Sequence, residues 1–446
     1  MPTMAPFRGL QYSLERFAST DVPDRVRLPG DERTPPRRVA NLTDLVCPPY
    51  DVIDAKLQAA LLARHERNAV RLELNPSDDP HRGSVETLSA WRSEGTLEVG
   101  AAPSVYRYSH ARSVAPDEPS VSGILARVLL EPWGAGVRPH ERTHPGPKAD
   151  RLALLRATQT QLSPILALYF DRSDRDRQSM HAPASDEWRA RDEDGLVHRL
   201  EAVEPDERVL NHLGRRTLFV ADGHHRYETA LAYQAEVRSD SRLGRAETGA
   251  LAADWIMAVL VNAEIEPLEI LPTHRILRDV PANALRALAD GSNPLFSAVP
   301  VRADDLPRVL DERRDAPEPT FGLVIPGGAY LLVGRTDAVA DRMAREPLSP
   351  VSRGLDLAVL HAAILGDRLG LDPAAVAAGD RLLYTRDPAE ALASVRETDA
   401  SAAILVRPIR LEQLAAVAGA GEVMPQKSTY FYPKLLTGLV FNPLEE

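Results

Sequence analysis

The densest group of reactive side chains in the sequence is the run Asp-Gly-His-His-Arg at residues 222–226. A strand-like stretch at 217–220 precedes it and helical composition follows, so we predict a strand, a glycine turn and a helix. The N–H groups and dipole at a helix start bind anions, and imidazole and guanidinium groups add donors for phosphate. The predicted phosphate-binding corner therefore contains Asp222, His224, His225 and Arg226. The alternatives are an aspartate that caps the helix and histidines that pack for structure.

A second polar segment, residues 138–148, contains the H-E-x-x-H pattern of zinc proteases. That chemistry needs both histidines on one face of a continuous helix. Prolines stand on both sides of the pattern and exclude such a helix. We interpret the segment instead as a loop that presents Glu141 as a carboxylate base, with a solvated charged loop as the alternative. The supporting or anion-binding candidates around it are His140, Lys148 and Arg151.

A third segment near the C-terminus places one ammonium and two hydroxyls close together, at Lys427, Ser428 and Thr429. These groups suit a phosphate, but the preceding residues lack the G-x-x-x-x-G of a Walker A loop. A polar turn is the simpler interpretation of this segment taken alone. A further supporting candidate, for which core or surface is the default, is the triplet Thr273, His274 and Arg275.

Lysine is rare in this chain, because only four of the 53 basic residues are lysine: Lys56, Lys148, Lys427 and Lys434. A sequence that drifts towards arginine keeps lysine where a planar guanidinium cannot replace a compact ammonium. Three of the four lysines lie in or beside the polar segments above. Their positions support those segments as functional, with chance clustering as the alternative.

These segments must be positioned by a fold that mixes strands and helices without strict alternation. We therefore predict an α+β fold, with a first domain at 1–280 and a smaller C-terminal α/β domain at 281–446 that completes the site. Residues 321–325 and 329–333 flank Pro-Gly-Gly, which predicts a hairpin. The other strand-like runs are 69–74, 104–108, 122–130, 165–170, 255–261 and 404–406, and the other helical runs are 55–65 and 152–157.

Composition narrows the class of protein. The net charge is −11, which argues against a dedicated nucleic-acid binder. The single cysteine, Cys47, excludes an intramolecular disulfide and is expected to be buried as a small hydrophobe. Residues 1–10 lack the basic start and apolar stretch of a secretion signal, so we do not expect secretion, and the sequence has no apolar run long enough to cross a membrane. We expect a cytoplasmic protein that works on a small molecule without a membrane partner.

Five motifs together resemble those of the bacterial domain-of-unknown-function family 1015. They are Pro-Pro-Tyr-Asp-Val-Ile at 48–53, Pro-His-Glu-Arg-Thr at 139–143, Ala-Asp-Gly-His-His-Arg-Tyr-Glu-Thr-Ala at 221–230, Pro-Thr-His-Arg at 272–275, and Lys-Ser-Thr-Tyr-Phe at 427–431. The resemblance covers essentially the whole chain.

Three of these motifs, in the same order, are also similar to those of the archaeal free serine kinases, which have a ParB-like fold. This resemblance implies a ParB-like N-terminal core, with Glu141 as the base for the substrate hydroxyl and Asp222 as a group that binds or activates the substrate. The implied phosphate contacts are His224, His225 and Arg226, with Lys427, Ser428 and Thr429. Two features depart from that pattern, because a longer segment precedes Pro-His-Glu and a glutamine separates proline from Lys-Ser-Thr.

The resemblance implies a phosphotransferase that converts free L-serine into O-phosphoserine, or runs the reverse reaction. The donor would be pyrophosphate, or ADP or ATP, with Mg²⁺, and we favour pyrophosphate because no nucleotide-base pocket can be recognised. The alternatives are a nucleotide-binding, ParB-like DNA-associated or regulatory protein and a small-molecule phosphatase.

Overall fold

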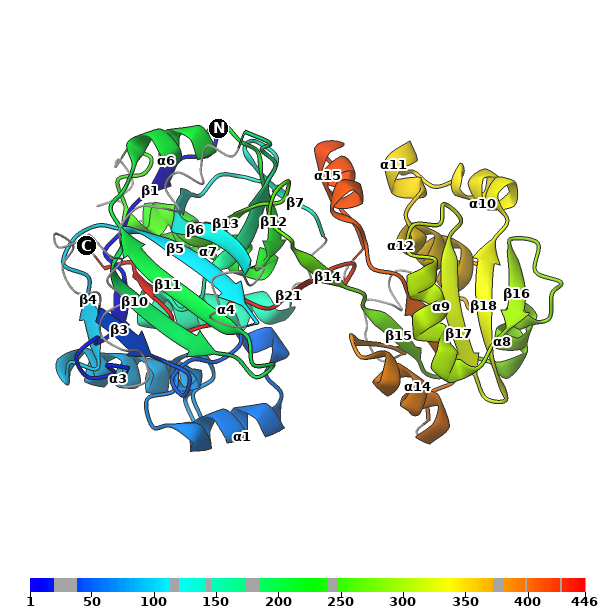
Figure 1. Ribbon diagram of the computed structural model, residues 1–446, viewed down its shortest axis with the longest axis horizontal. Coiled ribbons are helices and arrows are strands. Elements are labelled where there is room, and N and C mark those ends of the chain that lie inside the picture. The colour runs from blue at the N-terminus through cyan, green and yellow to red at the C-terminus, as the bar shows by residue number, and fades with distance from the viewer. Residues whose placement is uncertain are drawn as a thin grey trace, which may run out of the picture. The chain divides into compact units, whose positions relative to one another are not determined.

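The computed structural model describes residues 1–19, 38–112, 120–141, 146–173, 184–239, 247–371, 381–397, 399–425 and 427–445. These residues form two compact units (Figure 1). The first unit comprises Met1–Pro139, Pro145–Leu268 and Pro433–Glu446. The second comprises His140–His144 and Glu269–Tyr432. No helix within the described ranges is both long enough and apolar enough to cross a membrane.

A ten-stranded mixed sheet forms the centre of the first unit, which agrees with the predicted α+β class. The strand order is β3-β10-β11-β5-β6-β13-β9-β12-β7, and β1 pairs with β6. The pairs β3–β10, β9–β13 and β7–β12 are parallel, and the others are antiparallel. The strands are β1 (Met4–Ala5), β3 (Arg38–Asn41), β5 (Val105–Ala111), β6 (Ser120–Leu129), β7 (Val137–Pro139), β9 (Ile165–Tyr169), β10 (Ala184–Arg191), β11 (Val197–Val203), β12 (Leu218–Asp222) and β13 (Trp255–Asn262).

Strands β13 and β9 lie at the middle of this sheet because their sequences are almost continuously apolar. Every residue of β9 is buried, as is all of β13 after Trp255. Such runs suit strands that are covered on both faces, whereas a half-exposed strand alternates apolar and polar residues. The main core of the unit therefore forms around β6, β9 and β13.

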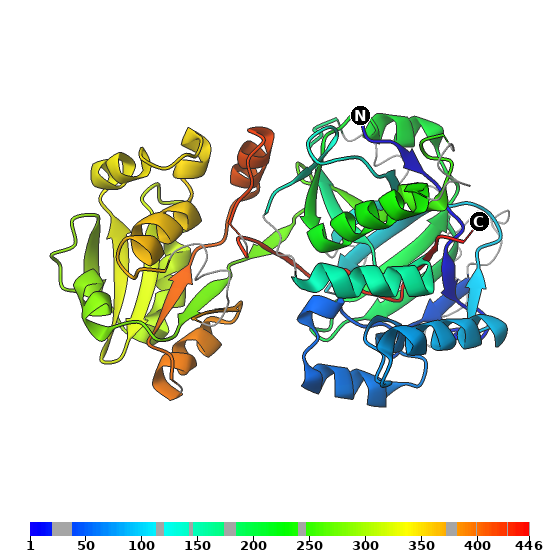
Figure 2. The ribbon, with the colours of Figure 1, turned by 180° about the vertical axis from the view of Figure 1, so that it is seen from behind.

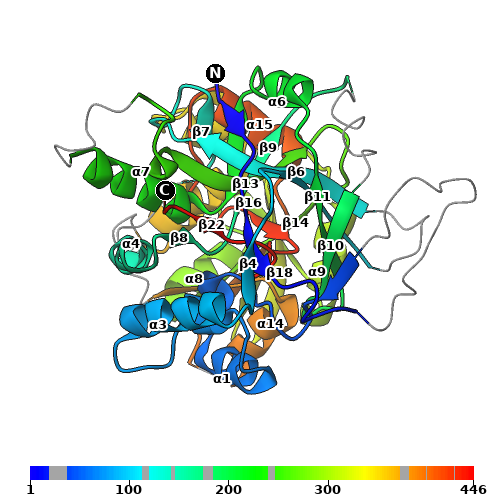
Figure 3. The same ribbon diagram turned by 90° about the vertical axis from the view of Figure 1, so that its left-hand side faces the viewer.

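Three helices, α3 (Pro80–Ser93), α4 (Gly146–Thr158) and α7 (His224–Ser239), lie side by side on one face of the sheet (Figures 2 and 3). Leu155 of α4 and Tyr233 of α7 pack in one apolar cluster with Leu444. Helix α3 begins where Asp79 accepts a hydrogen bond from the Arg82 N–H and Pro80 occupies the first turn. The remaining short elements are η1 (Tyr50–Val52), α1 (Ala55–Arg64), α2 (Val70–Glu73), α6 (Glu207–Leu213) and η2 (Ala252–Asp254).

The predicted strand at 69–74 is wrong, because residues Val70–Glu73 form helix α2. The side chain of Asn68 explains the difference, because its Oδ1 accepts a hydrogen bond from the Val70 N–H at 3.0 Å. Its Nδ2 donates to the carbonyls of Asp44 and Val46. These long-range bonds fix the start of a helical turn, and the alternating apolar residues are buried in it.

The last residues of the chain complete the first unit. Strand β22 (Asn442–Pro443) pairs with β8 (Thr160–Gln161), and β2 (Leu10–Tyr12) pairs with β4 (Leu97–Val99). The Phe441 carbonyl accepts from the Leu10 N–H at 2.9 Å, and Thr437 bonds through its backbone to buried Cys47. The segment from Pro433 onward is therefore integral to the unit formed by the N-terminal half.

A six-stranded antiparallel sheet forms the second unit, in the order β16-β18-β17-β20-β15-β19. Its predicted hairpin is confirmed as β17 (Thr320–Ile325) and β18 (Gly328–Gly334). Gly327 in that turn has a φ of +94°, which favours glycine. The other strands are β15 (His274–Leu277), β16 (Phe296–Pro300), β19 (Leu382–Thr385) and β20 (Ala402–Val406), and β14 (Glu269–Leu271) pairs with β21 (Tyr430–Tyr432) in a separate ladder.

Helices cover both faces of this second sheet. Leu306 and Leu310 of α9 (Leu306–Glu312) and Leu392 of α14 (Pro388–Glu397) pack on the face that carries Val324. Phe321 and Leu323 point to the opposite face because side chains alternate along a strand, and both are fully buried. Figure 2 shows α12 (Asp356–Val359) and η4 (Leu360–Gly366), in gold, on that side. The remaining helices are α8 (Ala282–Ala289), α10 (Thr336–Met343), α11 (Pro350–Arg353) and α15 (Leu411–Gly419).

The division of the chain differs from the single boundary that we predicted after residue 280. The first unit ends at Leu268, and the chain returns to it at Pro433. The observed boundary lies before residue 280 because β15 pairs with β20 and β19, which come more than a hundred residues later in the chain. Pairing over such a distance leaves no mark in the local pattern of residues.

Candidate functional site

The predicted strand, glycine turn and helix at 217–237 are present as β12 and α7, joined at Gly223. Gly223 has a φ of +89°, and a Cβ there would lie 2.7 Å from Cγ2 of Ile165. Both the backbone conformation and the close packing therefore require glycine. This corner places Asp222 at the end of the strand and the N–H groups of the first turn of α7 directly after it.

Asp222 is the counterion of two cations in the first unit. Its Oδ1 pairs with Nζ of Lys434, and its Oδ2 accepts a hydrogen bond from Nη2 of Arg226 at 2.6 Å. Burial acts to raise the pKa of Asp222, but Lys434, Arg226 and His224 together hold it well below its usual range. Asp222 is therefore ionised at neutral pH and fixes both cations at this corner.

Lys434 is the principal residue of this cluster that sequence reasoning did not assign. It follows β21 and lies in the C-terminal segment that returns to the first unit. Its side chain is 12% exposed, which is uncommon for a lysine unless it is paired. The scarcity of lysine in the chain was the only signal in the sequence that could have identified it.

The histidines and Arg226 begin helix α7, as predicted. The ring of His224 lies 6.4 Å from that of Trp133, and Trp133 stacks on Tyr227 with centroids 4.1 Å apart. Nη1 of Arg226 donates to Oγ of Ser163 at 3.2 Å and to the Pro164 carbonyl. The guanidinium is thereby held across the end of the sheet, beside the start of the helix.

Lys148 and Arg151, which we expected beside Glu141, belong to helix α4 of the first unit. Lys148 forms an ion pair with Glu228 of α7. Nε of Arg151 donates to Oδ2 of Asp150 at 2.9 Å. The structure therefore joins them to helices of the first unit, whereas Glu141 belongs to the second.

Glu141 binds the backbone of the Lys-Ser-Thr turn in the second unit. Its Oε1 accepts from the Lys427 N–H at 2.7 Å, and its Oε2 accepts from the Ser428 N–H at 3.2 Å. Lys427 is exposed and has a φ of +56°, a left-handed conformation that is uncommon for any residue except glycine. Successive N–H groups around a left-handed residue form a concave anion site. The turn at 427–428 is such a site, and a carboxylate lies in it.

His140 and Thr429 support the contact between Glu141 and the turn at 427–428. His140 is almost completely buried, and its Nε2 lies 2.7 Å from Oγ1 of Thr429. Its ring packs edge-on against Phe431. Met424 bonds through its backbone N–H to the His140 carbonyl at 2.8 Å. His140 is thus a positioning residue for the loop that carries Glu141, and the partner histidine of the zinc-protease pattern, His144, lies outside the described residues.

The triplet 273–275 contributes one residue to the same turn. Arg275 is fully buried, and its Nη2 donates to the Lys427 carbonyl at 3.3 Å. Burial lowers the pKa of Arg275 to about 10, while Tyr384 and Glu141 act in the opposite direction. Nδ1 of His274 accepts from the Val406 N–H at 3.2 Å, and burial lowers its pKa to about 4. Arg275 therefore positions the turn, whereas His274 is part of the sheet core and Thr273 lends its carbonyl to Arg275.

The site residues thus fall into two groups, each within one unit. The first unit contains Asp222, His224, His225 and Arg226 together with Lys434. The second contains Glu141, Lys427, Ser428 and Thr429, supported by His140 and Arg275. Both groups pair an anion with donors that suit phosphate oxygens.

Among the described residues, neither of the two candidate carboxylates, Asp222 and Glu141, offers a ready site for the Mg²⁺ that we expected. Both oxygens of Asp222 already face cations, and both oxygens of Glu141 accept backbone N–H groups. The described part of the chain also has no cluster of three or more His, Cys, Asp or Glu side chains that could hold a metal ion. Lys434 and Arg226 supply positive charge at the β12–α7 corner.

Comparison with solved structures gives distant likenesses. A conserved hypothetical protein from Pyrococcus furiosus is 12% identical, with a TM-score of 0.34, and the match covers 67% of this chain and 89% of that one. A free serine kinase in complex with AMP is 11% identical, with a TM-score of 0.36 and coverage of 68% and 88%. SbnI with a C-terminal truncation, from Staphylococcus aureus, is 13% identical, with a TM-score of 0.37 and coverage of 72% and 87%. These scores are too low to carry an argument about function.

None of the curated proteins matches the chain. One family model matches residues 30–358, which is most of the sequence, and its description is "Protein of unknown function (DUF1015)". The matched range includes the loop of Glu141, the β12–α7 corner and the triplet at 273–275. The motifs of the sequence and this match lead to the same conclusion: the chain belongs to the DUF1015 family.

Proposed function

We propose that this protein transfers a phosphoryl group to the hydroxyl of free L-serine, from pyrophosphate or a nucleotide, and that it can run the reaction in reverse. The observation that carries the proposal is the anion site at Lys427 and Ser428. The backbone N–H groups of Lys427 and Ser428 already bind a carboxylate, and Lys427 itself is exposed. A phosphate oxygen has the same charge and the same need for donors as that carboxylate.

Glu141 is the proposed base. In the reaction its carboxylate accepts the proton of the serine hydroxyl, the serine oxygen bonds to phosphorus, and the bridging P–O bond of the donor breaks. Orthophosphate leaves when the donor is pyrophosphate, and AMP or ADP leaves when it is a nucleotide. Such a transfer depends on positioning and electrostatic stabilisation, so no nucleophilic side chain is required.

The anion site also suggests how Glu141 becomes available. The donor phosphate and the Glu141 carboxylate compete for the N–H groups of Lys427 and Ser428. Binding of the donor would release Glu141 from these two hydrogen bonds, and a carboxylate that accepts fewer hydrogen bonds is a stronger base. The base would thus be activated only when a phosphate is present, which limits wasteful hydrolysis.

The cluster in the first unit is proposed to bind the substrates. Arg226 and the first turn of α7 offer donors for phosphate, with His224 and His225 beside them. Asp222 keeps Arg226 and Lys434 in place through its two oxygens. The order of the motifs along the sequence, which resembles that of the free serine kinases, supports serine as the acceptor.

The test is ³¹P NMR of the full-length protein with L-serine and Mg²⁺, with pyrophosphate, ADP and ATP supplied in separate samples. A new O-phosphoserine signal in one sample is the expected result and identifies the donor. Orthophosphate without phosphoserine would show a phosphatase. Unchanged serine and donors in all samples, and no phosphate release from phosphoserine, would reject the proposal.

A further inference from the structure

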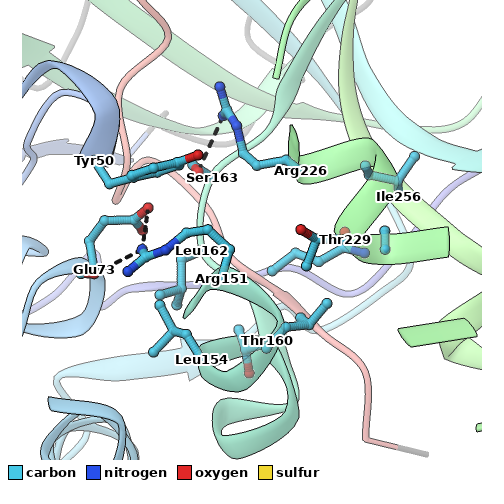
Figure 4. Close-up of a pocket in the computed structure, with 13 residues that line it drawn as sticks. Tyr50, Glu73, Arg151, Leu154, Thr160, Leu162, Ser163, Arg226, Thr229 and Ile256 are labelled. Atoms are coloured by element: carbon cyan, nitrogen blue, oxygen red, sulfur yellow. Dashed lines mark hydrogen bonds and ion pairs between the residues drawn. The ribbon is translucent and has the colours of Figure 1, made fainter. Parts of the chain in front are cut away.

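A pocket in the first unit brings together charged and polar residues from four different elements. Its wall includes Tyr50 of η1, Glu73 of α2, Arg151 of α4, and Arg226 and Thr229 of α7. Figure 4 shows Glu73 beside Arg151 on one side of the pocket and Thr229 on another. Tyr50 and Glu73 come from the segment that precedes Pro-His-Glu, to which neither the motifs nor the proposed function assigns a role.

Glu73 and Arg151 form the charged side of this pocket. Oε1 of Glu73 lies 3.6 Å from Nη1 of Arg151, and the same Nη1 donates to the Glu73 carbonyl at 3.1 Å. The guanidinium of Arg151 lies 4.5 Å from the centre of the Tyr50 ring, a cation–π distance. Burial raises the pKa of Glu73, while Arg151 and Arg226 lower it. The net effect is a raised pKa, so the pocket holds the carboxyl group of Glu73 beside two cations, and all three groups are largely removed from solvent.

Two buried polar atoms of the pocket have no hydrogen-bond partner among the residues that the structure describes. They are Oε2 of Glu73, whose side chain is 4% exposed, and Oγ1 of Thr229. Leaving a buried polar atom unsatisfied is costly, so such atoms in a native protein call for a ligand or water. When Glu73 is ionised this oxygen can only accept a hydrogen bond, so the matching partner is a donor such as an ammonium group.

The size of the pocket restricts what can enter. Its volume is about 60 Å³, which corresponds to roughly four to six water molecules at about 10–15 Å³ each. The rest of the wall is apolar and includes Leu154, Leu155 and Ile256. A free amino acid with a short side chain is compatible with this volume and this wall.

The pocket also adjoins the β12–α7 corner, because Arg226 belongs to both. The Arg226 guanidinium bonds Asp222 and Ser163, and Ser163 lines the pocket. A ligand in the pocket would therefore lie against a cation that we assign to the reaction.

We propose that this pocket binds a small free α-amino acid, with the ammonium group on Glu73 and the carboxylate facing Arg151 and Arg226. Thr229 supplies a hydroxyl to either end of the ligand. This inference deepens the proposed function, on which the choice of serine rests, by placing the acceptor site in the first unit.

The test is isothermal titration calorimetry of the full-length protein, without a phosphate donor, with three ligands. L-Serine carries both charged groups, ethanolamine lacks the carboxylate, and 3-hydroxypropionate lacks the ammonium. We expect serine to bind at least about tenfold more tightly than either analogue, since each lost charged hydrogen bond costs about tenfold or more. The affinity of the Glu73→Gln variant for serine should be lower by about tenfold or more, while its affinity for 3-hydroxypropionate should be unchanged.

Two further variants keep the result interpretable. Glu66→Gln makes the same change at an exposed position of the same segment and should leave serine binding unaltered. Thr229→Val removes the unpartnered hydroxyl and preserves the shape of the side chain, and it should lower the affinity for serine severalfold. This variant tests the pocket if Glu73→Gln unfolds. Serine that binds no better than its analogues, or equally well to wild type and to the folded pocket variants, overturns the inference.

This outcome is separable from that of the proposed function. Phosphoserine formation with a serine KM that does not change in Glu73→Gln would retain the reaction and reject the pocket. Serine binding that depends on Glu73, without phosphoserine from any donor, would retain the pocket and reject the reaction.

Discussion

The Glu141 carboxylate accepts a hydrogen bond at 2.7 Å from the backbone N–H of Lys427, a residue 286 positions later in the chain. The Ser428 N–H binds the other carboxylate oxygen. The carboxylate thus occupies a pair of donors that would otherwise attract a phosphate. This contact joins the base candidate to the phosphate-binding candidate within one unit.

Replacing Glu141 by glutamine should remove the proposed base and preserve the local structure, because the amide oxygen still accepts one backbone N–H. We expect kcat for phosphoserine formation to fall by about 10²–10⁴-fold. The thermal unfolding temperature should change little. Glu412→Gln, at an exposed position of α15, is the matched control in the same unit. A Glu141→Gln enzyme with wild-type kcat would remove Glu141 from the chemistry.

Replacing Lys427 should separate stability from activity. Its left-handed backbone costs roughly 1–2 kcal/mol for a residue with a Cβ, and glycine avoids that cost. Part of this gain in stability is lost because glycine also raises the conformational entropy of the unfolded chain. Lys427→Gly should therefore unfold in urea at a concentration no lower than wild type, but turn over more slowly because the ammonium is gone. Lys427→Ala removes the same charge and keeps the strain, so it should be the less stable of the two. A fully active Lys427→Gly would show that only the backbone of this turn matters.

Removing Lys434 should leave Asp222 with one of its two cations missing in a buried site. Breaking a buried ion pair by losing one partner costs about 3–5 kcal/mol, so Lys434→Met should lower the free energy of unfolding by a large part of that amount. Lys56→Met, on the exposed surface of α1, should change it by less than about 0.5 kcal/mol. Urea titration at neutral pH measures both. Equal stability of the two variants would mean that Lys434 is not paired in solution.

The stability of the first unit should depend on pH through His110. Burial, with His198 as a second cause, lowers the pKa of His110 to about 3, whereas an unfolded histidine titrates near about 6.5. Between these values the unfolded chain binds more protons, so the free energy of unfolding falls as the pH falls, by up to about 1.4 kcal/mol per pH unit. Below about pH 3 both states are protonated, and this contribution changes no further.

The measurement is urea unfolding at several pH values between 7 and about 4.5, above the range in which carboxylates dominate. His110→Gln should give a flatter dependence than wild type. The same slope in wild type and His110→Gln would show that His110 is not the group that titrates.

The local elements and the chemical types of the site residues can be predicted from the sequence alone. The apolar run of β13, the hairpin of β17 and β18, and the glycine turn before α7 follow from period, turn residues and backbone freedom, which are local properties. Scarcity of lysine singled out Lys427 and Lys434 without giving either a partner.

Which of those residues contact one another depends on the three-dimensional fold. Glu141 contacts Lys427, and Asp222 pairs with Lys434, because segments far apart in the chain fold into the same unit. Glu73 looked like part of a strand, yet hydrogen bonds from Asn68 make it the end of a helical turn, where its carboxylate faces Arg151. Such pairings depend on packing across the whole unit. A local pattern of residues can name the groups that do chemistry, but it does not encode the distances between them.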